Sequence, residues 1–201
     1  MLTPLEAEHE LQAAAQMSPG PWVGHSRAVG ENARLIAARV EGMNPDWAYA
    51  MGLLHDIGRR EGFKGILHLF DGYEYMLRLQ QPEIARICLT HSYPVQDARV
   101  YFGQVDCTDE QMAFLTDFLR TIQYDEYDRL IQLCDSLSLP DGACIMEKRL
   151  VDVCLRHGLH DFTLDKWRAD LRLKRHFDEL CGCNLYALLP RVMENSYLSL
   201  L

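Results

Sequence analysis

Apolar side chains recur every three or four positions along most of this chain, and no segment alternates apolar and polar residues as a half-buried strand would. In one segment, for example, Val29, Ala33, Ile36 and Val40 fall on one face of a helix. The same spacing predicts helices over residues 4–16, 22 or 25 to 40, 45–56, 66–80, 82–91, 109–122, 126–137, 143–157 and 164–181, with a final segment over 184–198. We therefore expect an all-α fold.

Residues that commonly start or stop helices flank many of these segments. The start signals are Asn44 followed by Pro45, Pro82, Thr108 with Gln111 three residues later, and Thr163. The stop signals are Gly58, Gly158 and Gly182, and Pro190 is expected to divide the final segment. The segments between the predicted helices are too short to act as linkers between domains.

The organisation of the chain is that of a single domain, because it contains no internal repeat and no low-complexity tract. With 201 residues, of which 48% are hydrophobic, the chain can bury one sizeable core. We expect one domain over residues 1–201, with its core over about 20–155 and a helical appendage over 160–201.

The charge balance argues against bulk nucleic-acid binding. The chain has 20 lysines and arginines against 29 acidic residues, a net charge of −9, so it does not attract nucleic acid or anionic lipid as a whole. Its first residues lack the basic start and apolar run of a signal peptide, and no segment approaches the ~20 apolar residues of a membrane span. We expect a cytoplasmic protein without a membrane partner. A homo-oligomer is compatible with the sequence.

Seven cysteines, an odd number, lie mostly within apolar helical segments. This placement favours reduced thiols that act as small core residues over a disulfide framework. The sequence Cys181-Gly182-Cys183 has no second cysteine pair at a distance suited to a soft metal ion. We interpret Gly182 as a helix stop instead.

The pair His55-Asp56 is the most specific candidate for chemistry, since it closes an apolar segment and is followed by Gly58. Neighbouring residues in a helix point about 100° apart, so they share a ligand only where the backbone ends or bends. An imidazole nitrogen and a carboxylate oxygen at a helix end suit a divalent ion such as Mn, Fe, Co, Ni or Zn. A histidine alone would be ordinary at the negative end of a helix dipole, but the aspartate beside it is disfavoured there.

Further candidate ligands belong to separate predicted helices. They are His25, His68, His91 and Asp135. Asp135 follows a strongly apolar turn, so its carboxylate is expected to be partly buried and to need a metal ion or a cation as partner. The order His25, then His55-Asp56, then Asp135 resembles the H…HD…D pattern of HD-domain metal-dependent phosphohydrolases. The resemblance covers about residues 20–155 and implies an HD-type helical bundle in which these four residues converge on one ion.

His68 and His91 extend the pattern to H…HD…H…H…D, which is similar to the two-metal branches of the superfamily. Those branches include cyclic-dinucleotide phosphodiesterases and diadenosine-tetraphosphate hydrolases. The resemblance implies that Asp56 bridges two ions and that His68 and His91 help to form the second site. Gly72, four residues after His68, permits another backbone to approach closely. The Gly-Tyr-Pro element of the cyclic-dinucleotide branch is absent, because Ser92-Tyr93-Pro94 follows His91, so that substrate is not indicated.

Arg59, three residues after Asp56, matches the position at which related hydrolases carry a lysine or arginine near the substrate phosphate. A guanidinium there could bind phosphate oxygens in a bidentate manner. We interpret Arg60 as a cation placed favourably at a helix end. Lys64 and the charged segment 147–149 are weaker candidates for phosphate contact.

The resemblance therefore implies a metal-dependent phosphohydrolase, of phosphomonoesterase or phosphodiesterase type. It would act on a small phosphorylated molecule or nucleotide with one or two divalent ions, drawn from Fe, Mn, Co, Ni, Zn and Mg. Asp56 would orient or deprotonate the attacking water. Two alternatives stay open. One is an HD-fold di-iron oxygenase, since the ligands suffice for two irons, and the other is a non-catalytic, metal-stabilised sensor or binding module.

Overall fold

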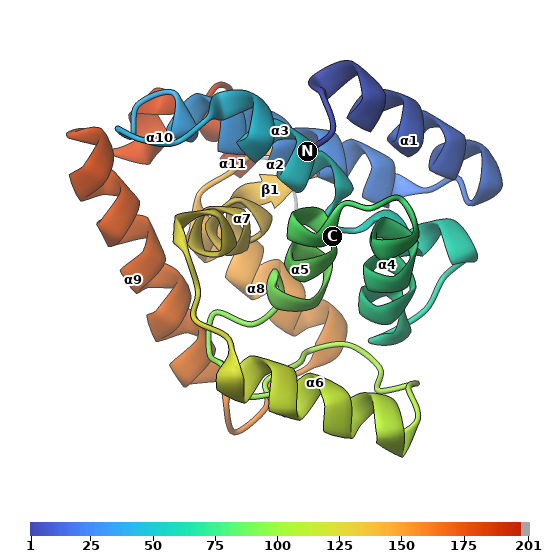
Figure 1. The fold of residues 1–201 in the computed structure, drawn as a ribbon. Helices are drawn as coiled ribbons and strands as arrows, with labels where there is room; N and C mark the ends of the chain where they lie inside the picture. Colours follow the sequence, from blue (N-terminus) through green and yellow to red (C-terminus); the bar gives the residue numbers. More distant parts are fainter. Residues whose placement is uncertain (198–201) are drawn as a thin grey trace.

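A computed structural model describes residues 1–197 of the chain and shows a bundle of helices (Figure 1). The elements are α1 (Pro4–Met17), α2 (Pro21–Ala37), α3 (Pro45–Leu54), the 3-10 helix η1 (Ile57–Glu61), α4 (Leu67–Arg78), α5 (Pro82–Thr90), α6 (Asp109–Thr121), α7 (Glu126–Leu137), β1 (Ser138–Leu139), β2 (Gly142–Ala143), α8 (Met146–His157), α9 (Thr163–Cys181), α10 (Leu185–Leu188) and α11 (Val192–Tyr197). The two strands pair antiparallel, with Ser138 opposite Ala143. The all-α prediction is confirmed.

Local signals explain most of the helix ends. The Asn44 side chain accepts hydrogen bonds from the backbone N–H groups of Asp46 (2.9 Å) and Trp47 (3.2 Å), which caps α3 as expected. Thr108 and Gln111 form the predicted capping box at the start of α6. The predicted helix stop after α9 is also confirmed, since Gly182 has the left-handed conformation.

Three expectations about helix ends are wrong. The second helix ends at Ala37 instead of residue 40, followed by a turn in which the Val40 N–H donates to the Ala37 carbonyl. Thr163 does not cap α9, because it is the first helical residue and its hydroxyl accepts from the His160 N–H (2.9 Å). Gly58 does not stop α3, which ends at Leu54, and it lies inside η1.

Pro190 separates α10 from α11 as expected, while residue 198 of that predicted segment lies outside the described residues.

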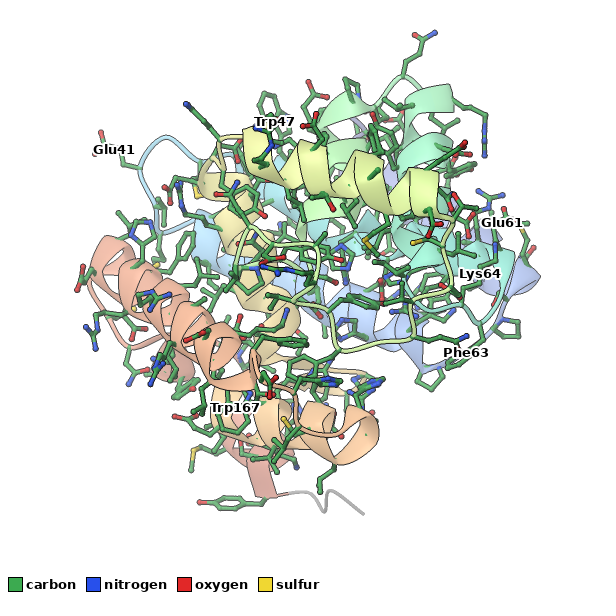
Figure 2. The ribbon with its side chains drawn as sticks, turned by 90° about the horizontal axis from the view of Figure 1, so that it is seen from below. Glu41, Trp47, Glu61, Phe63, Lys64 and Trp167 are labelled. Atoms are coloured by element: carbon green, nitrogen blue, oxygen red, sulfur yellow. The ribbon has the colours of Figure 1, made fainter. Side chains whose placement is uncertain are left out.

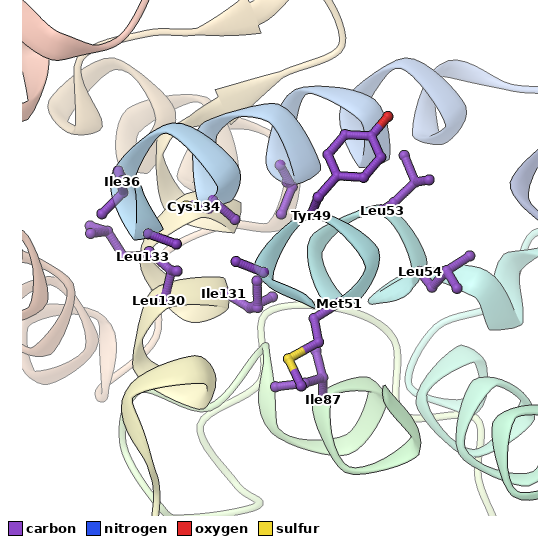
Figure 3. Close-up of a cluster of buried hydrophobic side chains, with 14 of the residues drawn as sticks. Ile36, Tyr49, Met51, Leu53, Leu54, Ile87, Leu130, Ile131, Leu133 and Cys134 are labelled. Carbon is purple, nitrogen blue, oxygen red and sulfur yellow. The ribbon is translucent and has the colours of Figure 1, made fainter. Parts of the chain in front are cut away.

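Helix α3 is the centre of the hydrophobic core. Every residue from Ala48 to Leu54 is buried, because α1, α2, α5 and α7 pack around this short apolar helix. Figure 3 shows Met51 of α3 beside Ile87 of α5, and Leu130 and Ile131 of α7 on another side. Burial on all sides fixes the end of α3, and therefore the position of the His55-Asp56 pair that follows it.

The close crossing of α2 and α3 depends on two glycines. A β-carbon added to Gly52 would lie 2.8 Å from the Cα atom of Gly30, so only glycine fits without a backbone shift. This contact brings the start of α2, with His25, close to the end of α3, with His55.

The helices beyond residue 155 share this core. Phe177 of α9 is fully buried, and Leu185, Leu189 and Val192 of the last segments belong to the same hydrophobic cluster as α2 and α3. Helix α9 packs along α7 and runs down one side of the molecule (Figure 1). None of the helices described within residues 1–197 has the length and apolar character needed to span a bilayer.

Candidate metal centre

The six predicted metal ligands meet at one place, and each lies at or near a helix end. His25 is near the start of α2, and His68 is the second residue of α4. His55 and His91 are the residues that follow α3 and α5, and Asp135 is in the last turn of α7. Asp56 lies between α3 and η1. Helix ends from five parts of the fold therefore converge on a single buried cluster.

His25, His55 and Asp135 form the first group of potential ligands. Their donor atoms all lie within 4.8 Å of one another. His25 Nε2 is 2.9 Å from Asp135 Oδ1, and the His25 and His55 rings meet edge to face with centroids 5.3 Å apart. Two imidazoles and a carboxylate at this spacing match the ligand set of a divalent transition-metal ion.

His55, Asp56 and His91 form the second group, with donor atoms again within 4.8 Å of one another. The ring centroids of His55 and His91 are 4.8 Å apart. His68 belongs to neither group by that spacing, but its Nε2 lies 3.0 Å from Asp56 Oδ1, and His91 Nε2 lies 3.6 Å from the same oxygen. The imidazole rings are neighbours in the order His25, His55, His91 and His68, and Asp56 lies beside the last three of them.

Backbone carbonyls hold three of the rings in the tautomer that a metal ion requires. The Nδ1 atoms of His55, His68 and His91 donate to the carbonyl oxygens of Gly52 (2.6 Å), Gly65 (2.5 Å) and Ile87 (3.1 Å). Since each proton is on Nδ1, each Nε2 keeps a lone pair that points into the cluster. A hydrogen bond of this kind orients a ligating histidine and raises its basicity.

The cluster fits a cation because two of its inward-facing atoms lack hydrogen-bond partners. Among the described residues, His55 Nε2 and Asp56 Oδ1 are buried without a partner. His68 Nε2 lies 3.0 Å from Asp56 Oδ1 and accepts a long hydrogen bond (3.4 Å) from Arg59 Nη2. Buried polar atoms without partners are costly, and this donor set could hold a metal ion.

The comparison with protein families agrees with this geometry. The family model for the HD domain matches residues 22–139, more than half of the chain. The chain belongs to the HD domain family. No curated protein and no solved structure gives a match to it. The matched region contains all six potential ligands of the HD domain, while α1 and the helices from α8 onward lie outside it.

Asp56 carries a negative charge inside the cluster. Burial raises the pKa of its carboxyl, but the Arg59 guanidinium and the His55 and His68 rings act more strongly together and hold the pKa well below its usual range. Arg59 Nε donates to Asp56 Oδ2 (2.6 Å), which leaves Oδ1 for His68 and His91. Asp56 is therefore ionised at neutral pH, as a metal ligand must be.

Protonation of the centre should destabilise the metal-free HD domain in acid. Burial and the neighbouring His55 lower the pKa of His91 to about 3, and burial also lowers the pKa of His55. In the unfolded chain both rings would bind protons near pH 6.5. Between about pH 6.5 and 3 the unfolded state therefore holds more protons, and the free energy of unfolding decreases as the pH is lowered. We expect a loss of about 3 kcal/mol in unfolding free energy between pH 7 and 4, measured by urea denaturation.

The depressed pKa values of Asp56 and Asp135 act in the same direction below about pH 4, since both carboxylates are ionised only in the folded state there. A His91→Asn variant removes one of the titrating rings and should lose less stability over the same range. A wild-type profile that is flat from pH 7 to 4 would contradict these protonation states.

Gly58 allows η1 to pack closely against α4 beside the cluster, a role that the sequence analysis did not predict. A β-carbon on Gly58 would lie 1.9 Å from the His68 carbonyl oxygen and 2.5 Å from the Gly72 nitrogen. The close approach expected at Gly72 is present, and its partner is η1. The contact between η1 and α4 is what brings His68 to Asp56. The signal that the sequence offers is a glycine two residues after Asp56.

Tyr101 and Lys64 are two further residues to place relative to the cluster. Tyr101, from the segment after α5, has its hydroxyl pKa raised by burial, and the charges of Arg59 and Asp56 also act on it. The sequence pattern did not separate it from ordinary core aromatics. Lys64 lies at the outer edge of the molecule beside the exposed Phe63 (Figure 2), and its ammonium donates to Asp71 Oδ2 (2.6 Å). Its phosphate contact stays a prediction.

Proposed function

We propose that this HD-domain protein is a metal-dependent phosphohydrolase that acts on a small phosphate ester or nucleotide. The observation that carries the proposal is the arrangement of inward-facing lone pairs around Asp56, with the ring N–H groups turned away to backbone carbonyls. This donor set suits one or two ions of Fe, Mn, Co, Ni or Zn, whereas Mg prefers oxygen ligands. Such ions, when bound, lower the pKa of a coordinated water and neutralise phosphoryl oxygens.

The orientation of the ligands favours two ions bridged by Asp56. An imidazole whose Nδ1 is bonded to a carbonyl has only one free donor, so His55 cannot bridge. The Asp56 carboxylate has two oxygens, of which Oδ1 faces His68 and His91 and Oδ2 lies 3.9 Å from His55 Nε2. His25, His55 and Asp135 would complete one site, while His68 and His91 would belong to the other.

The roles of the side chains follow from their positions. Asp56 would orient the attacking water or accept its proton, because its carboxylate is buried and ionised at neutral pH. Arg59 Nε is already bonded to Asp56 and Nη2 contacts His68 Nε2 (3.4 Å), and the remaining terminal N–H groups can bind phosphoryl oxygens and stabilise the charge that develops on them. The side chain of Arg59 is 26% exposed, so a substrate can reach it.

Arg59→Met should weaken phosphate binding, and the assay is made at saturating metal because Arg59 Nε also donates to Asp56 Oδ2 (2.6 Å). We expect KM for a phosphate ester to rise by about tenfold or more, since a charge-assisted hydrogen bond to phosphate is lost. Arg60→Met is the matched control, because the Arg60 guanidinium lies over the Tyr75 ring (3.8 Å) and donates to the Met17 sulfur. Equal KM values for the two variants would contradict the role given to Arg59.

Phosphate release by the metal-loaded protein tests the proposed activity. A panel of chromogenic phosphomonoesters, phosphodiesters, nucleoside phosphates and cyclic nucleotides should contain substrates, and removal of metal by a chelator should abolish turnover. Oxygen uptake by the reduced iron-loaded protein, with no phosphate release, would favour an oxygenase. Bound metal without turnover over the whole panel would favour a sensor or binding module.

A further inference from the structure

Helix α9 reaches the metal centre although it lies outside the matched HD region. The Lys166 ammonium donates to the carbonyl oxygen of Ser92, the residue that follows His91. One helical turn later, Asp170 Oδ1 accepts from the Ser136 hydroxyl (3.1 Å), and Ser136 follows Asp135. The face of α9 that carries Lys166 and Asp170 therefore rests on two residues that are direct chain neighbours of potential metal ligands.

Lys166 has no paired anion at this position. Within residues 1–197 no carboxylate lies within 4.0 Å of its ammonium, whereas Lys174 on the same helix is 2.7 Å from Asp178. Burial lowers the pKa of Lys166, and the attraction of Asp170 and Asp135 opposes this shift. A partly buried ammonium that bonds to a single carbonyl retains donors for an anionic ligand.

The surroundings of Lys166 contain other unsatisfied polar groups. Asp170 is only 1% exposed, and its Oδ2 is buried without a partner among the described residues. The same is true of Arg149 Nε in α8, and the charge of Arg149 acts on both Lys166 and Asp170. The Phe102 ring lies 6.0 Å from the Lys166 ammonium. Lys166 therefore has spare donors and lies close to an aromatic ring, and the nearby Arg149 is paired with Asp152 (3.0 Å).

We propose that Lys166 binds a phosphate group of the substrate, so that α9 forms one wall of the active site. The inference rests on the proposed phosphohydrolase function and adds to it a second cationic contact besides Arg59. The two cations come from different elements, Arg59 from η1 and Lys166 from α9. A mobile ammonium suits this role because it can follow phosphate oxygens as a point charge.

Phosphate binding by charge-matched variants tests the proposal. Lys166→Gln should weaken the binding of inorganic phosphate to the metal-loaded protein by about tenfold or more, measured by calorimetry, and Lys166→Arg should recover most of it. Arg168→Gln removes the same charge from the outer face of α9, where Arg168 pairs with Asp165 (3.0 Å), and should leave binding within about twofold. Equal affinities for Lys166→Gln and Arg168→Gln would overturn the proposal.

Amine labelling of the wild-type protein gives a second test that needs no folded variant. Saturating inorganic phosphate should slow the acetylation of Lys166 by about fivefold or more, as measured by mass spectrometry. The acetylation rate of Lys174 should not change, since Lys174 is already paired with Asp178. Figure 2 labels Trp167, the residue that follows Lys166 on α9. Equal acetylation rates of Lys166 with and without phosphate would overturn the proposal.

Metal content separates this proposal from the function on which it rests. If the wild type binds metal and hydrolyses phosphate esters while Lys166→Gln binds phosphate normally, only the role of Lys166 fails. If the wild type binds no metal, the phosphohydrolase proposal fails, and the labelling of Lys166 still reports whether α9 holds an anion.

Discussion

Replacing Asp56 with asparagine or His55 with alanine is expected to abolish tight metal binding and to lower phosphate-ester hydrolysis by more than about 10²-fold. Loss of a residue that merely orients a ligand typically costs 10- to 100-fold in metal affinity or activity, and loss of the ligand itself should cost more. Asp56 is the residue whose two oxygens face both groups of imidazoles, and His55 is common to both groups. Elemental analysis and initial rates on the purified variants measure the two effects.

His176→Ala is the matched control for these variants. His176 lies on α9 and bonds to Glu126 (2.7 Å), away from the buried cluster, so its removal should leave metal content and rate unchanged. Full metal content in either His55→Ala or Asp56→Asn would contradict the assignment of the centre. A rate that falls equally in His176→Ala would show that the assay reports general instability.

Gly58→Ala is expected to have the largest effect on stability and to disturb the metal centre as well. The added methyl would lie 1.9 Å from the His68 carbonyl oxygen, and both atoms are fixed by backbone, so η1 and α4 must separate. Overpacking of this kind costs about 3 kcal/mol or more in unfolding free energy. Because the same movement withdraws His68 from Asp56, the metal content of the second site should also fall. Urea denaturation and elemental analysis check the two parts.

Gly42→Ala separates the effect of space from that of backbone conformation. Gly42 has a φ of 82°, which strains any other residue, but nothing lies within 4 Å of an added β-carbon. We expect a loss of about 1 kcal/mol and an unchanged metal content in that variant. A Gly58→Ala protein as stable as Gly42→Ala, with full metal content, would contradict the importance of the contact between η1 and α4.

Several of the potential ligands could be predicted from the sequence because His55, His91 and Asp135 lie where apolar helical segments end. His55-Asp56 after a fully apolar helix and Asp135 after an apolar turn are polar groups at the edge of the core, and such groups need a partner. The helical periodicity of α2, α5 and α7 likewise predicted the elements that carry them.

The supporting contacts were not accessible in this way, since they join segments far apart in the chain. Nothing in the periodicity around Gly58 distinguishes a helix stop from a close approach to α4, and only the second role is present. From the sequence, Lys166 is expected to be a solvated charge on an amphipathic helix. Its position beside the metal centre depends on how α9 packs against α7. Local patterns carry no information on such distances.

The number of metal ions per chain tests the two-ion phosphohydrolase most directly. Elemental analysis should be made on protein purified without chelator or affinity-tag metal, for the wild type and for His68→Ala and His91→Ala. The Asp56-bridged centre predicts about two ions in the wild type and about one in each variant, because both imidazoles face Asp56 Oδ1. About one ion in all three proteins would contradict it, and would restrict the site to His25, His55, Asp56 and Asp135.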